Sequence, residues 1–323
     1  MTPHRSGPAA PRAERPGLVA GEFASREEAH AWGRARLRDA GLDVRAAWVE
    51  ADLLLRHAAG LTREETLLRP RAPVGDASGA AYAALIARRA AGCPSAYLVG
   101  RREFCGLALD VDPRVLIPRP ETERLVEVVA AALAARPAPL VVDVGTGSGA
   151  IALALTHLLP GARAVATDVS RGALAVARGN AERLGLAGRV TWRCGDGLGA
   201  LAGVVPAAGA DALCANPPYV PSADVDALPR EVRDHEPRAA LDGGPDGLGV
   251  HRRIIAGAAS YLKPGGLLAL ETCAEGHQAR AVAALIATGG GFAPARIVKD
   301  YAGLDRVVVS TRLAAPAGSG DTP

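Results

Sequence analysis

Residues 140–149 read LVVDVGTGSG, an apolar run that leads directly into three alternating glycines. A strand followed by a glycine-rich turn and a helix builds a nucleotide-binding pocket, because glycine lets the backbone approach a ligand closely. Gly145, Gly147 and Gly149 are spaced G-x-G-x-G, which differs from the G-x-G-x-x-G of dinucleotide-binding folds. The stretch therefore predicts an α/β domain with a nucleoside pocket after its first strand.

Apolar runs and helical patterns alternate along the rest of the chain. This alternation is typical of a doubly wound, mostly parallel sheet that binds ligands at the carboxyl ends of its strands. We expect an α/β fold with a Rossmann-like sheet of seven strands. The predicted strands are residues 140–144, 164–168, 190–194, 212–215 and 267–271, with a closing pair near 295–298 and 306–310. The predicted helices are residues 121–135, 149–159, 170–184, 249–262 and 275–287.

Two acidic residues follow the next predicted strands. Asp168 ends the second strand, where a carboxylate can accept hydrogen bonds from both hydroxyls of a ribose. Its alternative role, capping the helix that follows, is already filled by Ser170. Asp196 lies in a Gly-Asp-Gly turn after the third strand and is predicted to accept a hydrogen bond from an adenine amino group; the alternative is an acid exposed to solvent. Both positions favour a nucleoside ligand.

The second informative stretch is Asn216-Pro217-Pro218-Tyr219, directly after the apolar run 212–215. The side-chain oxygen of Asn216 can accept one N–H of a planar NH2 group, and the backbone oxygen of Pro217 can accept the other. The prolines stiffen the loop, and Tyr219 can stack on the flat face of the target. Beside a nucleoside pocket, this loop predicts methyl transfer from S-adenosylmethionine to an amide or amino nitrogen, catalysed mainly by positioning for an in-line displacement.

The composition is that of an ordinary globular protein. At 323 residues, 49% hydrophobic and 22% charged, the chain can form two domains, and its net charge of +3 does not indicate nucleic-acid binding. The five cysteines are widely spaced without a Cys-x-x-Cys pair, so we predict neither a metal site nor disulfides. No segment reaches the roughly 18 apolar residues of a membrane span. We expect a cytoplasmic monomer without direct contact to nucleic acid or membrane.

The N-terminal part of the chain shows helical patterns and no strand pattern. Helices are predicted over 25–41, 44–57, 62–70 and 77–91, followed by a short hairpin that turns near Gly106. Trp32, Trp48 and residues 53–55 are predicted to lie in the core of this part. We therefore predict a disordered extension over 1–20, a helical bundle over 21–95, a hairpin linker over 96–122, a catalytic domain over 123–313 and a disordered tail over 314–323.

With these residues placed, the chain resembles the release factor glutamine methyltransferases, enzymes that modify the glutamine of the Gly-Gly-Gln tripeptide in peptide chain release factors. The resemblance extends from about Ala29 to Val309. Its most specific parts, besides the Asn-Pro-Pro-Tyr loop, are PSAYLVG (94–100) with Glu103-Phe104, LIPRPETE (116–123), Glu236-Pro237, ALDGGPDGL (240–248) and DYAGLDR (300–306).

The resemblance implies a class I S-adenosylmethionine-dependent methyltransferase domain, joined by a β-hairpin to an N-terminal helical bundle. Because this bundle is a separate unit without catalytic residues, we predict that it docks the protein substrate. It implies methylation of the side-chain amide nitrogen, N5, of the release factor glutamine. An acid at Asp143 would help to orient the amino group of the cofactor's methionine part. The implied cofactor residues are Asp143, Gly145, Thr146, Gly147, Ser148, Gly149, Asp168, Asp196, Gly197 and Asn216. The implied substrate residues are Asn216, Pro217, Pro218 and Tyr219, of which Asn216, Pro217 and Tyr219 would be catalytic.

Segment 117–123 would lie beside the cofactor pocket; its alternative role is a linker whose Glu121 and Glu123 complement a helix dipole. Two departures from the family pattern matter. Gly197 stands where many relatives carry a large residue against adenine. After the predicted strand 267–271, the spacing of acids leaves open whether Glu271 or Glu275 matches the glutamate of the family.

Other functions share parts of this pattern. A ribosomal protein glutamine methyltransferase has the same fold and loop, and the LIPRPETE stretch favours the release factor enzymes over it. A DNA adenine N6-methyltransferase would need a basic channel or a target-recognition domain, which the chain does not show. The glycine spacing and the Asn-Pro-Pro-Tyr loop disfavour an NAD-dependent oxidoreductase. A binding module without catalysis is disfavoured because both halves of an active site are present.

Overall fold

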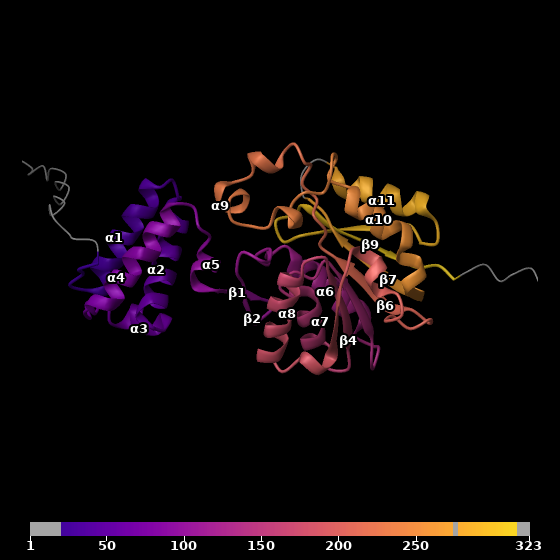
Figure 1. Ribbon diagram of the computed structural model, residues 1–323, viewed down its shortest axis with the longest axis horizontal. Coiled ribbons are helices and arrows are strands. Elements are labelled where there is room, and N and C mark those ends of the chain that lie inside the picture. Colours follow the sequence, from indigo (N-terminus) through magenta and orange to yellow (C-terminus); the bar gives the residue numbers. More distant parts are fainter. Residues whose placement is uncertain (1–20, 274–276, 315–323) are drawn as a thin grey trace, which may run out of the picture. The chain divides into compact units, whose positions relative to one another are not determined.

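The structure is a computed structural model that describes residues 21–273 and 277–314 (Figure 1). The extension predicted over 1–20, all but the first residue of the tail predicted over 314–323, and the predicted start of a helix at 275 lie outside the described residues. The chain divides after Val99 into two compact units. No helix of the described residues is long and apolar enough to cross a membrane, and within the same ranges no group of His, Cys, Asp and Glu could hold a metal ion.

The first unit is helical, as predicted, and its helix ends are set by side-chain caps. The Ser25 side chain accepts a hydrogen bond from the Glu28 N–H, Asp43 caps the second helix, and Gly60 ends that helix in the left-handed conformation. Thr62 and Glu65 form a capping box. The helices are α1 (Arg26–Asp39), α2 (Val44–Ala59), α3 (Arg63–Leu68), α4 (Asp76–Ala90) and the unpredicted short α5 (Ser95–Val99).

The core of this unit differs from the prediction at one tryptophan. Leu54 and Leu55 of α2 are buried, and the Trp32 ring packs against the ring of Phe23 at a centroid distance of 5.3 Å. The prediction that Trp48 lies in the core was wrong, because this side chain is 40% exposed. Trp48 projects from the outer face of α2, and its ring meets the ring of His30 edge-on instead.

The predicted hairpin is confirmed and opens the second unit. Strands β1 (Arg101–Phe104) and β2 (Leu107–Asp110) pair antiparallel around Cys105 and Gly106, whose φ angles are +48° and +77°. Positive φ at both turn residues suits the right-handed twist of a two-residue hairpin. The Asn180 side chain ties β2 to the rest of the unit, since its oxygen accepts from the Asp110 N–H and its NH2 group donates to the Asp110 carbonyl.

The second unit contains the predicted seven-stranded, mostly parallel sheet (Figure 1). The strand order is β5-β4-β3-β6-β7-β9-β8, and β9 runs antiparallel to both of its neighbours. Strand order reverses at β3, which lies between β4 and β6. The strands are β3 (Leu140–Val144), β4 (Arg163–Asp168), β5 (Val190–Cys194), β6 (Ala210–Ala215), β7 (Leu262–Glu271), β8 (Arg296–Lys299) and β9 (Asp305–Thr311).

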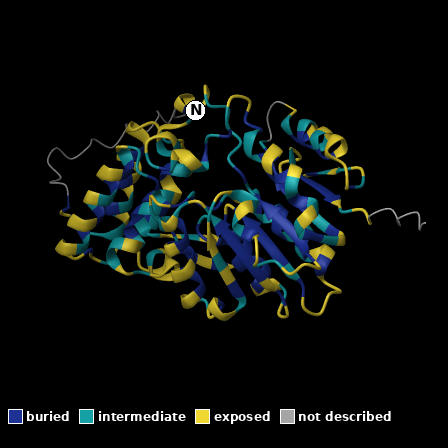
Figure 2. Ribbon diagram, turned by 45° about the vertical axis from the view of Figure 1, so that its right-hand side comes forward, coloured by how far each residue is buried: buried dark blue, intermediate teal, exposed yellow. Residues whose placement is uncertain are grey.

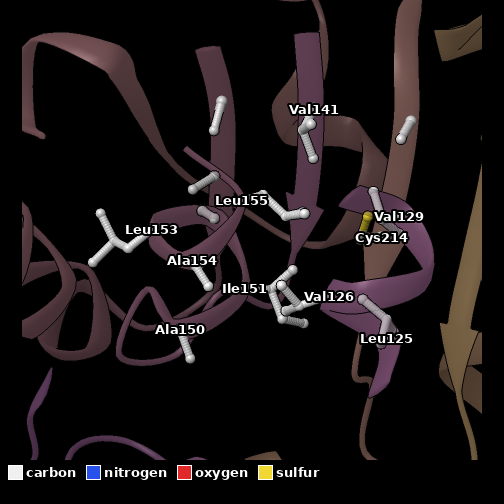
Figure 3. Close-up of a cluster of buried hydrophobic side chains, with 14 of the residues drawn as sticks. Leu125, Val126, Val129, Val141, Ala150, Ile151, Leu153, Ala154, Leu155 and Cys214 are labelled. Carbon is white, nitrogen blue, oxygen red and sulfur yellow. The ribbon is translucent and has the colours of Figure 1, made fainter. Parts of the chain in front are cut away.

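Helices cover both faces of this sheet, and its strands are buried between them (Figure 2). Val141 of β3 packs into one core with Leu125 and Ile151, and its neighbour Val142 packs into a second core with Ile254. Figure 3 shows side chains of the first core pointing from α6 and α7 toward the strands. The helices are α6 (Thr122–Leu133), α7 (Ala150–Leu158), α8 (Arg171–Arg183), α10 (Gly249–Ala258) and α11 (Gln278–Gly289).

The segment between β6 and α10, residues 216–248, is an irregular excursion that the sequence patterns did not resolve. It contains the short helix α9 (Arg230–Arg233) and two single 3-10 turns, Val225–Ala227 and Arg238–Ala240. The excursion begins with the Asn-Pro-Pro-Tyr loop, so its fold determines what surrounds that loop.

Candidate active site

The predicted site residues meet at one edge of the sheet. Val144 pairs with Thr167 of β4 on one side and with Ala215 of β6 on the other, and Ala215 pairs with Leu270 of β7. The residues that follow these positions therefore emerge side by side at the carboxyl ends of four neighbouring strands. Because strand order reverses at β3, this edge is the switch point where doubly wound sheets bind ligands.

The glycine-rich turn is held to the end of β4. The N–H groups of Gly145 and Thr146 donate to the Thr167 carbonyl, and the Gly147 N–H donates to Asp168 Oδ2 at 2.9 Å. Gly147 has a φ of +57°, and a Cβ there would meet nothing within 4 Å, so backbone conformation rather than crowding requires this glycine. The turn thus leaves open space beside Asp168.

Both carboxylate oxygens of Asp168 accept backbone hydrogen bonds, Oδ2 from the glycine-rich turn and Oδ1 from the loop that follows β4. Oδ1 accepts from the Ser170 N–H at 2.8 Å, and burial raises the pKa of the carboxyl above its ordinary value. Ser170, not Asp168, caps α8, because its side chain accepts from the Ala173 N–H. Each carboxylate oxygen retains a lone pair for a further donor, as two ribose hydroxyls would require.

Asp143 is fully buried under the turn and has an unused oxygen. Oδ2 accepts from the Thr146 hydroxyl at 2.6 Å and from the Ala152 N–H at 3.1 Å, whereas Oδ1 has no hydrogen-bond partner among the described residues. Burial raises the pKa of this carboxyl to about 6. A buried, half-satisfied carboxylate is costly unless a cation or donor completes it. The residues present therefore fit a nucleoside cofactor that carries an ammonium group.

Of the two residues predicted to face adenine, Asp196 is exposed and Gly197 is half-buried. Asp196 forms an ion pair with Arg253 at 2.6 Å, and both side chains are more than half exposed. Gly197 has a φ of +52°, and a Cβ there would meet nothing within 4 Å. Ser148 is buried in the glycine-rich turn, and its carbonyl accepts from the Asn180 side chain.

The Asn-Pro-Pro-Tyr loop borders a pocket. Asn216 Nδ2 donates to the Thr122 hydroxyl at 3.2 Å, which leaves Asn216 Oδ1 as an acceptor for a ligand. Burial raises the pKa of Tyr219 to about 12, with a contribution from the negative charge of Glu271. The pocket has a volume of about 170 Å³ and is lined by Leu116, Arg119, Asn216, Tyr219, Val220, Leu228, Val232, Ala240 and Leu241.

The ALDGGPDGL motif holds this loop from behind. The Val220 N–H donates to the Leu241 carbonyl at 3.0 Å, and the Gly243 N–H donates to the Val220 carbonyl at 2.8 Å. At Gly247 a Cβ would lie 2.3 Å from the Tyr219 carbonyl oxygen, so only glycine allows this approach. Gln278 Nε2 donates to the same Tyr219 oxygen at 3.0 Å.

The LIPRPETE segment lines the same pocket through Leu116 and Arg119. Glu236, which is buried, accepts from the Ile117 N–H at 3.0 Å and from Arg119 Nη2 at 2.5 Å. Glu123 does not simply complement the α6 dipole, because its Oε1 accepts from the Cys105 N–H of the hairpin turn. The two sequence motifs Glu236-Pro237 and LIPRPETE therefore form one structural connection between the pocket and the hairpin.

Two residues without a predicted role also lie here, Thr122 and Glu271. Thr122 begins α6 and is buried, and Glu271 ends β7 and is fully buried. Glu275, the other acid left open by the sequence, lies outside the described residues. The sequence offered a signal for both, since Thr122 belongs to the LIPRPETE motif and Glu271 ends a predicted strand. Neither pattern revealed that the two residues converge on Asn216.

Two family models match the chain. Residues 28–100 match the model described as PrmC N-terminal domain, and residues 141–235 match a methyltransferase domain. Among solved structures, the catalytic domain of hMettl16, in complex with the MAT2A 3′UTR hairpin 6, has a TM-score of 0.53 and 18% identity. This match covers 72% of the present chain and 82% of the other, and it shows the fold.

Curated relatives match over almost their full length. The release factor glutamine methyltransferase of Moorella thermoacetica is 47% identical over 282 residues, which cover 87% of this chain and 97% of that protein. The proteins of the same name from Gloeobacter violaceus and Geobacter sulfurreducens are 44% and 43% identical. These matches cover 88% and 86% of this chain and 97% and 93% of the relatives.

Fold and domain match define an enzyme of the class I methyltransferases, which use S-adenosylmethionine. At this level of identity and coverage, the chain belongs to the family of release factor glutamine methyltransferases.

Proposed function

We propose that this enzyme methylates the N5 amide nitrogen of the glutamine in the Gly-Gly-Gln tripeptide of peptide chain release factors. The observation that carries the proposal is Asn216, which lines the pocket and keeps its Oδ1 as an acceptor, on a chain 47% identical to a protein named for this activity. A primary amide offers two neutral N–H donors, which match neutral acceptors in a pocket whose lining is mostly apolar.

The cofactor would lie along the carboxyl ends of β3, β4 and β5. Asp143 Oδ1 would accept from the ammonium group, Asp168 from the ribose hydroxyls, and Asp196 from the adenine amino group, with Gly145, Gly147 and Gly149 keeping the backbone open. S-adenosylmethionine supplies an electrophilic methyl group on a sulfonium. Asp196 would have to share its carboxylate with Arg253 or release that partner.

Replacing Asp168 with alanine will weaken S-adenosylmethionine binding. Removing an ionised acceptor of ribose hydroxyls costs about 1.5–3 kcal/mol, or roughly 10- to 150-fold in Kd. Isothermal calorimetry measures the effect, and Asp234→Ala is the control, because that aspartate forms an ion pair at the surface with Arg233. Unchanged affinity of Asp168→Ala, with the control also unchanged, would place the ribose elsewhere.

The Asn-Pro-Pro-Tyr loop would hold the substrate amide while the methyl group is transferred. Asn216 Oδ1 and the Pro217 carbonyl would each accept one N–H, and Tyr219 would cover the flat face of the amide. The apolar residues Leu228, Val232 and Leu241 would exclude water from the pocket. Such positioning aims the nitrogen at the methyl group, and a rigid loop loses little entropy on binding.

Replacing Gly247 with alanine will slow turnover, because its Cβ must displace the Tyr219 carbonyl that it would approach to 2.3 Å. A misplacement of the clamp by about 1 Å is worth up to about 100-fold in rate. The matched control is Gly265→Ala, since Gly265 has a similar φ of +75° but open space around its Cβ. Equal turnover of the two variants would mean that the ALDGGPDGL motif does not position the loop.

We further propose that the helical first unit docks the release factor, that the enzyme works as a monomer, and that it acts in the cytoplasm, where release factors function. Segment 21–95 would form the docking bundle and segment 123–313 the catalytic domain, with 96–122 between them. The first unit holds none of the residues assigned to cofactor or amide.

The substrate is tested by offering labelled S-adenosylmethionine with three acceptors in parallel: a purified release factor, ribosomal proteins and adenine-containing DNA. We expect label in the release factor alone. Label in a ribosomal protein would replace the substrate and keep the chemistry, and label in DNA would overturn the amide assignment. A release factor whose Gly-Gly-Gln glutamine is changed to alanine is the matched control and should take no label.

A further inference from the structure

The carboxyl ends of β6 and β7 bring an amide and a buried acid together. Ala215 and Leu270 are register partners in parallel strands, so the next residues, Asn216 and Glu271, emerge beside each other on the same side of the sheet. Glu271 is fully buried, and neither carboxylate oxygen makes a well-formed hydrogen bond to a described residue. An acid in that position is costly to keep unless it acts on a neighbouring group.

Thr122 connects the two side chains. Its hydroxyl oxygen accepts from Asn216 Nδ2 at 3.2 Å, and the hydroxyl proton has no acceptor with good hydrogen-bond geometry among the described residues. The same hydroxyl lies near enough to Glu271 to favour its ionised form. A hydroxyl that donates to a carboxylate becomes a better acceptor, and catalytic hydrogen bonds in unliganded sites are often long and tighten when the substrate binds.

We propose that Glu271 and Thr122 are positioning residues that fix the amide of Asn216 with its oxygen toward the substrate. The chain of donors runs from Asn216 Nδ2 to the Thr122 hydroxyl and from that hydroxyl to the Glu271 carboxylate. An asparagine amide can flip, and the flipped form would turn its NH2 group toward the NH2 group of the substrate. The inference rests on the proposed function, because it explains how the site selects a planar NH2 donor.

The direction in which the hydrogen bonds run between Asn216, Thr122 and Glu271 depends on the charge of Glu271. An ionised carboxylate can only accept, so Thr122 must donate to it and accept from Asn216. A protonated Glu271 can donate to Thr122, which then donates to Asn216 Oδ1 and favours the flipped amide. Since burial raises the pKa of Glu271 to about 7, the productive orientation is present above this pH and is lost as the pH falls through it.

The charged and titratable groups around Glu271 come from every packed element. Arg306 of β9 and Arg119 lower its pKa, and Glu121 raises it. Tyr219 lies close enough to feel the charges of Glu271 and Cys273. From α10, His251 Nε2 lies 2.9 Å from the Glu271 carbonyl, and burial lowers the pKa of His251, which keeps that ring neutral. Glu271, whose pKa is raised to about 7, is therefore the group whose charge changes nearest to neutral pH; Asp143, at the end of β3, follows with a pKa raised to about 6.

The chain offers a direct readout, because it contains only two asparagines, Asn180 and Asn216. With asparagine labelled by nitrogen-15, each side-chain NH2 group gives its own pair of NMR signals. Asn180 Nδ2 donates to the Asp110 and Ser148 carbonyls, so its signals serve as the internal control. We expect the Asn216 signals to shift with pH around 7 in the wild-type protein and to stop shifting in Glu271→Gln, while the Asn180 signals stay constant.

Kinetics of two threonine variants complete the test. Thr122→Val removes the hydroxyl at nearly constant shape and should lower kcat on the release factor about tenfold with little change in KM. Thr122→Ser keeps the hydroxyl and should retain turnover within about twofold of wild type. Thermal melting shows whether each variant is folded.

Three results would overturn the proposed hydrogen-bond relay from Asn216 through Thr122 to Glu271. They are an equal kcat for Thr122→Val and wild type, equal losses of kcat for the valine and serine variants, or Asn216 signals that shift with pH in Glu271→Gln as they do in the wild type. The NMR result does not depend on turnover. A wild-type enzyme that fails to methylate release factors would refute the proposed substrate, whereas the Asn216 signals would still decide the relay.

Discussion

Replacing Asn216 with alanine will nearly abolish methyl transfer, at a cost of roughly 2–4 kcal/mol of transition-state stabilisation. The variant loses the side-chain acceptor that we propose holds one N–H of the substrate amide, and the Thr122 hydroxyl loses its donor. An amide nitrogen is a weak nucleophile, so its rate of attack depends on being held in line with the methyl group. Single-turnover kinetics with a release factor measures the loss in kcat.

The control for this variant is Tyr301→Phe, which removes a hydroxyl that donates to the carboxylate of Glu127 at the surface. Calorimetry with S-adenosylmethionine separates the two roles assigned to Asn216, since a loss confined to cofactor affinity would leave single-turnover rates at saturation intact. Near wild-type turnover of Asn216→Ala at saturating cofactor would show that the loop is not the clamp.

Removing residues 1–99 will abolish methylation of the intact release factor and leave S-adenosylmethionine affinity nearly unchanged. The cut follows the boundary between the two compact units and removes α5 together with its packing partners, since Leu98 of α5 is buried in the core of the first unit. All residues assigned to cofactor and amide lie beyond it. A substrate chosen by docking of a separate unit loses effective concentration when that unit is removed.

The matched control removes residues 1–20 alone, and we expect it to keep full activity. Calorimetry and melting of the shortened protein show whether the catalytic unit still folds and binds cofactor. Equal activity of the 1–99 deletion and the full chain on the intact release factor would contradict a docking role for the helical unit.

The central strands could be predicted from the sequence because each is a short apolar run bounded by polar or turn residues. Strand β3 and the edge strand β5 have the predicted ends, since Gly145 and Gly195 follow them directly. Strand β7 is longer than predicted, because residues 263–266, Lys-Pro-Gly-Gly, read as a turn. In the structure these residues belong to the first half of β7, and the Lys263 side chain forms an ion pair with Asp211 of β6.

The excursion after Tyr219 and the surroundings of the clamp could not be predicted in the same way. Its helix α9 is one turn long and has no periodic pattern to detect. The start of α6 near Glu121 could be predicted, but the meeting of Thr122, Asn216 and Glu271 depends on the register of β6 with β7 and on the packing of α6 against these strands, which are long-range properties of the fold. Trp48 shows that a periodic pattern can also mislead, since this large apolar residue has nearly helical spacing with the core residues but lies on the exposed face of α2.

Tandem mass spectrometry of a release factor, digested after incubation with this enzyme and S-adenosylmethionine, tests the central claim most directly. We predict one added methyl group, located on the side-chain nitrogen of the Gly-Gly-Gln glutamine, in the wild-type reaction and not in the Asn216→Ala reaction. A methyl group on another residue, or an unmodified glutamine in the presence of bound cofactor, would contradict the account.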